Sequence, residues 1–394
     1  MKVLLLNNVP APYFNPLFER LGRESGWALT VCYVTARKND IGWGEQPPDS
    51  GAAYRTIILD GEPSRLKDFL GRPAATVRLL GVLARERPDY LISYGYWLPP
   101  QAAAISWAVA TGRPFAVIGD ANYYNDHATG VRRAVKGMWL KQVIRHAAAL
   151  ITVGTASRMF WEAYGARPDK LFESRYVVDN DFFARAAEER REEAAELRAR
   201  WGLEEAVVFL YVGRLVRRKG IDLLLRAASR LADENVAVIV AGDGEDRQAL
   251  EELAQGGRRV IFAGRLEPGE LPLYYAMADA LVLPARDEPW GLVVNEAMAS
   301  GLAVIAHRHC GAAVDLVGPD NGVALETFSV AELVEAMRLI AADGGRRRAM
   351  RRRSREKIRD WSVAEAARGI IRAVEGSSRP RLSQTVASEL GKLE

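Results

Sequence analysis

The sequence predicts an α/β protein made of two doubly wound, Rossmann-like parallel sheets. Its 394 residues exceed one ordinary domain and fit two of about 180 to 200 residues each. Short apolar runs alternate with helical patterns in two separate series, and a polar stretch near residue 180 divides the series. Such alternation is typical of parallel sheets with helices on both faces.

The first series begins with a strand over 2–6, a helix over 16–24 and a strand over 27–35. Residues 36–54, which include Trp43, have no clear period and predict a long loop, often a binding element on such a scaffold. The later elements alternate regularly: strands are expected over 90–93, 115–118 and 149–153, and helices over 73–86, 99–111, 131–147 and 155–164.

The second series follows a charged stretch over 184–201 that predicts one long helix. Its strands are expected over 207–212, 236–240, 260–262, 280–283 and 303–306, with helices from 220, 246 and 270 and over 292–300, 330–342, 344–359 and 363–375. We therefore predict an N-terminal domain over 1–180, a C-terminal domain over 181–362 and a mobile polar tail over 377–394.

Composition places the protein among globular cytoplasmic proteins. Apolar residues make up 49% and charged residues 26%, which suffices for a substantial core. The two cysteines, Cys32 and Cys310, fall in different halves, so no disulfide framework is expected and a reducing compartment is the default. No apolar run is long enough to cross a membrane, so we expect a cytoplasmic protein, free or peripheral on the inner face of the membrane.

The positive charge is concentrated in the first half. Residues 1–178 hold 22 Lys/Arg against 15 Asp/Glu, whereas residues 179–394 hold 32 against 35. A basic N-terminal domain suits an anionic membrane face or an anionic acceptor. The helix expected at 131–147 mixes cations with Val135, Met138 and Trp139, and we favour a core-facing helix with a basic outer face over a membrane-surface helix. No nucleic-acid module is recognisable, and nucleic acid is not an expected partner.

A strand-to-helix turn after 280–283 carries two glutamates. Glu288 lies on the loop and Glu296 one turn inside the helix, at the strand edge where parallel sheets bind ligands. Gly291 permits close backbone approach, and the free N–H groups at Gly291 and Leu292 suit a phosphate. The alternative is a loop acid with an unrelated exposed helix acid.

A basic loop follows the strand at 207–212. Gly213 ends the strand, and Arg214 and Lys219 flank a tight loop that ends at Gly220. Arginine offers a planar fork and lysine a point charge, a combination that neutralises a diphosphate. The loop contains no acidic neighbour, and the alternative is a solvated basic loop.

Other patterns favour neither a redox cofactor nor a metal. The turn around Gly242 follows a strand, but Arg247 occupies the third glycine position of a dinucleotide fingerprint. Residues 307–310 (His-Arg-His-Cys) lack a further ligand for zinc. Residues 179–181 (Asp-Asn-Asp) lie at the expected hinge, away from the strand ends.

Three motifs in this order, G-R-x4-K-G at 213–220, G-x-G at 242–244 and E-x7-E at 288–296, resemble retaining GT-B glycosyltransferases of family 4, the glycosyl transferases group 1. The resemblance implies two domains facing across a cleft, with the last helix, 363–376, packing back on the N-terminal domain. It also implies sugar transfer, with retained anomeric configuration and no metal, from a UDP- or GDP-sugar to a glycan, lipid-linked or small-molecule acceptor.

The resemblance also assigns roles to residues of the second half. It implies that Arg214 and Lys219 hold the donor diphosphate, that Glu296 binds ribose and that Glu288 binds the transferred sugar. The remaining donor positions that it implies are Gly213, Gly242, Arg265, Leu266, Gly291 and Leu292.

The first half departs from the family pattern. Near the strand end at 115–118, where the family often has a histidine, this chain has Gly119 and Asp120, and His127 comes later. The acceptor-side polar group is therefore either Asp120 or His127. Rival readings are a nucleotide-sugar epimerase or phosphorylase on the same scaffold, or a non-catalytic nucleotide-binding subunit.

Overall fold

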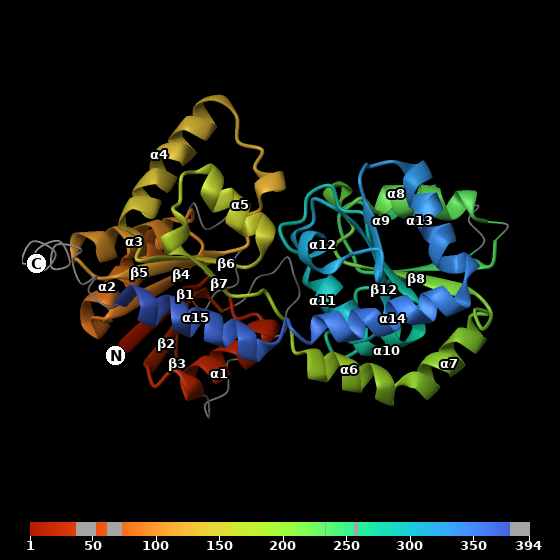
Figure 1. Ribbon diagram of the computed structural model, residues 1–394, viewed down its shortest axis with the longest axis horizontal. Helices are drawn as coiled ribbons and strands as arrows, with labels where there is room; N and C mark the ends of the chain where they lie inside the picture. Colours follow the sequence, from red (N-terminus) through yellow and green to blue (C-terminus); the bar gives the residue numbers. More distant parts are fainter. Residues whose placement is uncertain (37–52, 61–72, 233, 256–258, 379–394) are drawn as a thin grey trace, which may run out of the picture.

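The protein forms two parallel sheets, each flanked by helices, that lie side by side (Figure 1). The computed structural model describes residues 1–36, 53–60, 73–232, 234–255 and 259–378. The strand orders are β3-β2-β1-β4-β5-β6-β7 and β10-β9-β8-β11-β12-β13. Each order grows outward in both directions from its first strand, so both sheets are doubly wound and the predicted fold class is confirmed.

The N-terminal sheet is buried on both faces. Along β1, Val3 and Leu5 join one apolar core while Leu4 and Leu6 join the other, as the two-residue period of a strand requires. The strands of this sheet are β1 Lys2–Asn7, β2 Ala28–Thr35, β3 Arg55–Asp60, β4 Tyr90–Tyr94, β5 Phe115–Gly119, β6 Ala149–Thr152 and β7 Leu171–Glu173. Its helices are α1 Asn15–Glu24, α2 Pro73–Glu86, α3 Pro99–Ala110, α4 Gly130–His146 and α5 Thr155–Ala163.

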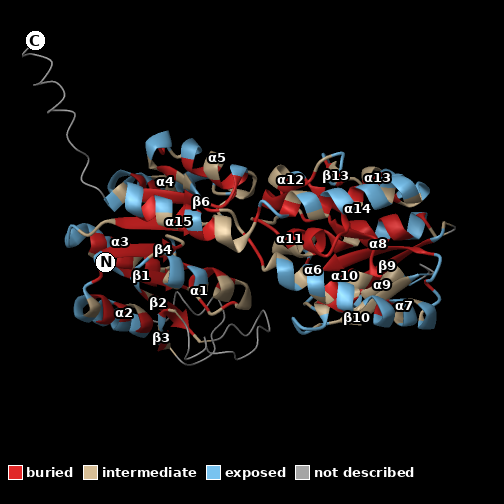
Figure 2. Ribbon diagram, turned by 60° about the horizontal axis from the view of Figure 1, so that its bottom comes forward, coloured by how far each residue is buried: buried red, intermediate tan, exposed pale blue. Residues whose placement is uncertain are grey.

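The C-terminal sheet has the same layered construction, with buried strands between helices whose outer faces are exposed (Figure 2). Its strands are β8 Val207–Val212, β9 Val236–Ala241, β10 Val260–Gly264, β11 Ala280–Leu283, β12 Ala303–His307 and β13 Gly322–Leu325. Its helices are α6 Asn180–Glu189, α7 Arg191–Arg200, α8 Ile221–Arg230, α9 Arg247–Ala254, α10 Leu271–Met277, α11 Leu292–Ala299, α12 Gly311–Leu316, α13 Val330–Ala342 and α14 Gly344–Ile358.

The sequence patterns did not reveal three of the strands, and they merged two helices into one. The missed strands β3, β7 and β13 lie at sheet edges, where one side is unpaired and the apolar pattern is weak. The helix expected over 184–201 is two helices, α6 and α7, that meet at Arg190. Asp179 accepts a hydrogen bond from the Phe182 N–H at 3.0 Å, so residues 179–181 begin α6. Most of the loop expected over 36–54, and the tail beyond 378, lie outside the described residues.

The last helix, α15 (Val363–Ser378), returns to the N-terminal sheet and packs on α1, β6 and β7. Gly369 permits this approach, because a Cβ there would lie 2.2 Å from the Glu173 carbonyl oxygen. The Ser174 hydroxyl donates to the Ala366 carbonyl at 3.0 Å. The chain therefore passes between the sheets twice, before α6 and after α14, while the exact domain limits stay a prediction.

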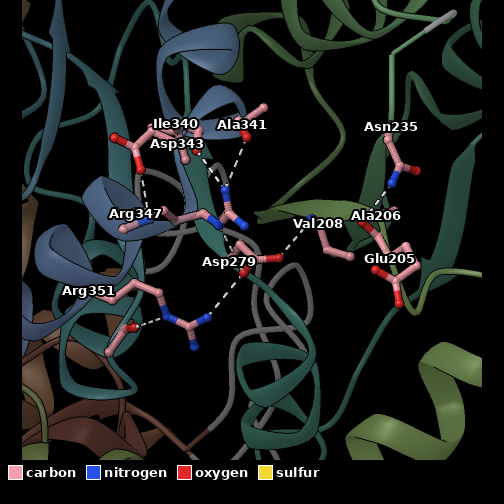
Figure 3. Close-up of polar contacts among 12 residues, drawn as sticks. Glu205, Ala206, Val208, Asn235, Asp279, Ile340, Ala341, Asp343, Arg347 and Arg351 are labelled. Atoms are coloured by element: carbon pink, nitrogen blue, oxygen red, sulfur yellow. Dashed lines mark hydrogen bonds and ion pairs between the residues drawn. The ribbon is translucent and has the colours of Figure 1, made fainter.

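Asp279 joins two helices, α7 and α14, to the amino end of the C-terminal sheet; Figure 3 shows its contacts with α14 and with Val208. Its carboxylate accepts the Val208 N–H at 3.0 Å, and it is only 7% exposed. Arg351 and Arg347 of α14 approach it at 3.2 and 3.4 Å. Arg198 of α7 approaches it at 3.5 Å. Arg347 and Arg351 of the arginine-rich stretch 346–353 therefore contact a buried carboxylate and do not belong to a solvated helix face.

No helix in the described part of the chain is long and apolar enough to span a bilayer.

We expect Asp279→Ala to lower the free energy of unfolding by about 3 kcal/mol, because three arginines would lose a shared buried counter-charge. The matched control is Asp320→Ala, which removes the exposed 2.8 Å pair that Asp320 makes with Arg353 of the same helix. The control should cost less than about 1 kcal/mol. Denaturant unfolding followed by circular dichroism measures both, and equal losses would contradict the structural role of Asp279.

Candidate active site between the two sheets

The carboxyl ends of the two sheets meet at Asn122. This buried residue follows β5, and its amide nitrogen donates to the carbonyls of Pro289 at 3.0 Å and His309 at 2.9 Å, with the Glu288 carbonyl 3.4 Å away. The loops after β5, β11 and β12 therefore lie together. Sequence reasoning missed Asn122, although its place directly after a strand end was a usable signal.

A second contact between the domains joins α5 to α12. Asp315 accepts the Thr155 N–H at 2.9 Å and the Thr155 hydroxyl at 2.5 Å. Side chains of the other domain pack so tightly on Gly154 that a Cβ there would lie 2.4 Å from the Asp315 carboxylate and 2.5 Å from the Trp290 ring. Glycine is thus required at 154 by contact across the interface.

Trp290 connects the loop after β11 to the segments that cross between the domains. Its indole N–H donates to the Asn295 side-chain oxygen at 2.9 Å, and the Asn295 amide donates to the Tyr176 carbonyl at 3.0 Å. Its ring stacks on Trp361, with ring centroids 5.1 Å apart. The start of α11 is therefore anchored to both crossing segments.

Glu288 and Lys219 form an ion pair, with side chains 13% and 14% exposed. The expectation that Lys219 has no acidic neighbour is wrong, because the 69 residues that separate it from Glu288 hide the contact from local inspection. The parallel strands β8 and β11 are neighbours in the sheet, so the loops that follow them converge. A cation and a carboxylate therefore lie together at the carboxyl edge of the C-terminal sheet, where a ligand would bind.

Arg286 holds these two loops against each other. Its guanidinium makes a bidentate pair with Asp222 at 2.7 and 2.8 Å, and the backbone N–H of Arg286 donates to the Arg218 carbonyl at 2.8 Å. Gly220 lies in the left-handed region, with φ of 69°, and a Cβ there would lie 2.0 Å from the Pro284 carbonyl oxygen. The position of Lys219 is thus set by backbone packing.

The other donor positions predicted from the sequence lie at the same sheet edge. A Cβ on Gly242 would lie 1.8 Å from the Gly213 carbonyl oxygen, so the turns that follow β8 and β9 pack closely against each other. Arg214 is exposed, and its guanidinium has no bond to another described residue. The remaining positions follow β10 or open α11: Arg265 is exposed, Leu266 and Leu292 are partly buried, and Gly291 is left-handed with φ of 94°.

Glu296 points to Tyr275. The Tyr275 hydroxyl donates to the Glu296 carboxylate at 2.6 Å. Loss of hydration raises the pKa of Glu296 to about 7, and the hydrogen bond from Tyr275 opposes part of that rise. The carboxyl group is therefore poised between its neutral and charged forms near pH 7.

The two acceptor-side candidates differ in their surroundings. Asp120 is exposed, yet nearby protein removes enough hydration to raise the pKa of its carboxyl, and repulsion from Glu288 raises that pKa further. His127 is also exposed, and no contact within the described residues joins its imidazole to Glu288. The carboxyl groups of Asp120 and Glu288 are therefore electrostatically coupled.

The described residues contain no group of three His, Cys, Asp or Glu side chains that could hold a metal ion. The ring of His307 stacks on Phe328 at 3.7 Å, and its Nδ1 accepts the His309 N–H at 3.1 Å. The His309 ring in turn stacks on Tyr124 of the other domain, 4.7 Å away. These two imidazoles are used in packing.

Two family models together cover most of the chain. Residues 193–357 match the family of glycosyl transferases group 1, and residues 10–172 match the glycosyl transferase 4-like domain. The D-inositol 3-phosphate glycosyltransferase of Corynebacterium aurimucosum is 29% identical over 340 residues, 80% of this chain and 77% of that protein. The alpha-D-kanosaminyltransferase of Streptomyces kanamyceticus is 28% identical over 243 residues, 59% of this chain. That match spans 62% of the kanosaminyltransferase, less than two thirds of its length.

The fold also resembles solved structures over nearly its whole length. HepE of Anabaena, in complex with UDP and glucose, aligns with a TM-score of 0.73 at 17% identity. The alignment covers 95% of this chain and 99% of HepE.

The raised pKa of Glu296 predicts a pH dependence of stability. The folded protein keeps this proton up to about pH 7, whereas the unfolded chain releases it near 4.5, so stability falls as pH rises through this window. We expect the parent to lose about 3 kcal/mol relative to Glu296→Gln between pH 4 and pH 8. Urea unfolding at both pH values measures the difference, with exposed Glu335→Gln as control. A parent-to-variant difference that stays constant with pH would contradict the assignment.

Proposed function

The chain belongs to the glycosyl transferases group 1 and has the GT-B fold, and from this premise we propose that it moves a sugar from a nucleoside-diphosphate sugar to a glycan, lipid-linked or small-molecule acceptor. The observation that carries the proposal is the Lys219–Glu288 pair beside the start of α11. It places a phosphate-binding cation next to a carboxylate that can bind sugar hydroxyls.

The diphosphate would be held by two cations and one helix start. Arg214 is free to offer a planar fork, Lys219 supplies a point charge, and the N–H groups at Gly291 and Leu292 open α11. Fixed positive charge at the departing diphosphate stabilises the transition state without a metal. In this arrangement the donor takes Lys219 away from Glu288, and the freed Glu288 carboxylate turns to the sugar.

The remaining acids serve the two ends of the reaction. Glu296 accepts hydrogen bonds from the donor ribose in place of Tyr275, and its pKa near 7 lets it ionise when those donors arrive. Asp120, preferred to His127 because repulsion from Glu288 raises the pKa of its carboxyl, orients the acceptor hydroxyl. The sugar keeps its anomeric configuration, and contact between the domains at Asn122 excludes water from the site.

The donor is proposed to be a UDP-sugar, with a GDP-sugar as the alternative, because the similar HepE structure holds UDP and glucose. We assign the protein to the cytoplasm, since its two cysteines are buried free thiols, with contact between its basic N-terminal domain and the membrane. A thermal-shift panel of UDP-, GDP-, ADP- and dTDP-sugars tests the donor. The correct one should add about 2.7 kcal/mol at a hundredfold excess over Kd.

If none of these nucleotides raises the melting temperature, the donor site is misplaced. Turnover of the donor without acceptor would favour an epimerase, and a requirement for inorganic phosphate would favour a phosphorylase. Binding without any turnover would favour a non-catalytic subunit.

Because Lys219 and Glu288 form an ion pair, substitutions of the two residues should have opposite effects on diphosphate binding. Lys219→Ala should weaken UDP binding by about 10- to 100-fold, since charge-assisted bonds contribute about 1.5–3 kcal/mol. Glu288→Gln should strengthen it by about fivefold, because the competing carboxylate disappears. Titration calorimetry measures both, with the neighbouring Asp287→Asn as the matched control. If the Glu288→Gln variant binds UDP no better than the control, Lys219 does not leave Glu288 to bind the diphosphate.

Substitutions of the two glutamates should affect different steady-state parameters. Glu288→Gln should lower kcat by about 10²-fold, because the lost group acts on the reacting sugar. Glu296→Gln should mainly raise the KM for the donor, because ribose does not react. Circular dichroism checks the folding of both variants. If Glu296→Gln lowered kcat and Glu288→Gln mainly raised the donor KM, the roles of the two glutamates would have to be exchanged.

A further inference from the structure

Helix α4 has an unusual charge composition. Its 17 residues contain no Asp or Glu. They contain five cations, Arg132, Arg133, Lys136, Lys141 and Arg145. Only Lys136 forms an ion pair within the described residues, with Asp126 at 2.7 Å. The helix thus presents a concentrated positive charge that the protein itself leaves largely unneutralised.

The same helix has apolar side chains on two opposite faces. Leu140, Val143 and Ile144 are buried against the N-terminal domain. On the other side Val131, Val135 and Met138, spaced i, i+4 and i+7, are 80%, 48% and 62% exposed. The helix faces the core and has a basic outer face, as expected, but that outer face also exposes Val135 and Met138.

Cations flank this exposed apolar line. At 100° per residue, Lys141 and Arg145 lie on one side of it and Arg132 on the other. Trp97, 53% exposed, follows Tyr96, whose carbonyl accepts the Trp139 indole N–H at 2.9 Å. An apolar line bordered by cations, with a tryptophan nearby, is the pattern of helices that lie in a membrane interface.

We propose that the outward face of α4, made of Val131, Val135, Met138, Arg132, Lys141 and Arg145, docks on the headgroup layer of an anionic lipid bilayer. Figure 1 shows α4 on the outer side of the N-terminal domain, away from the C-terminal sheet. Its length of about 26 Å allows it to lie along a surface. A second copy of the chain is disfavoured, because pairing two such faces brings like charges together.

The docking face is joined to the acceptor side of the site. Asp126, which pairs with Lys136 of α4, also accepts the Tyr164 hydroxyl at 2.5 Å. It lies six residues after Asp120 in the loop that follows β5. Docking would bring this loop to the lipid surface. The inference deepens the proposed function by naming the membrane element, but lipid binding is measured without any sugar transfer, so the two can fail separately.

The test is flotation of the full chain with vesicles. The protein should float with vesicles in which phosphatidylglycerol replaces about a third of the phosphatidylcholine, and should stay behind with phosphatidylcholine alone. Lys141→Gln/Arg145→Gln should weaken the apparent affinity by about tenfold or more. Val135→Ser/Met138→Ser should weaken it as well, because these side chains are exposed and enter the acyl boundary.

The matched control is Arg346→Gln/Arg348→Gln, which removes the same charge from exposed positions on α14 of the other domain. It should bind vesicles like the parent. Several results would overturn the proposal: no flotation of the parent, equal flotation on neutral vesicles, or equal loss in the control. Loss in the charge variant with none in the apolar variant would instead indicate an acidic protein or diffuse electrostatic partner. Unchanged melting temperatures establish that all variants are folded.

Discussion

The site depends on one constraint: all strands within each sheet run parallel, so every strand delivers its following loop to the same sheet edge. In this protein the two edges face each other, and the Asn122 amide crosses between them to the carbonyls of Pro289 and His309. The Thr155–Asp315 pair makes a second crossing. Because these contacts use backbone groups, the relative position of the domains constrains the loop that carries Glu288 directly.

The charged side chains of the site influence one another, and a bound anion would compete with Glu288 for Lys219. Lys219 neutralises Glu288, and repulsion from that same carboxylate raises the pKa of Asp120. Glu296 accepts a hydrogen bond from Tyr275 and has a pKa of about 7. In partly dehydrated surroundings an anion that captures Lys219 changes the charge felt by Glu288 and Asp120 together. Under the proposed function, diphosphate binding and sugar orientation would therefore be electrostatically coupled. The ion pair holds Lys219 and Glu288 in order until a ligand replaces one partner.

The helices and strands around the site are held in place by buried contacts. Asp279, at the opposite end of β11 from Glu288, holds α7 and α14 to the sheet through three arginines, and Trp290 locks the start of α11 to Trp361. Helix α15 then binds the end of the chain to the N-terminal sheet. Rigid elements thus surround the exchangeable pair, whereas the exposed apolar line of α4 lies on the outside, where a surface can meet it.

Local pattern determined the two sheets, the central strands and the places of Arg214, Lys219, Glu288 and Glu296 on strand ends, because buried parallel strands and glycine turns leave strong short-range signals. Edge strands such as β3 lacked that signal, since half their surface is unpaired. Tertiary structure alone decided partners that are distant in sequence: Lys219 with Glu288, Asn122 with His309, and Arg351 with Asp279. It also decided that Met138 faces solvent. The packing of neighbouring elements determines which face of a helix the core covers, and composition does not encode that packing.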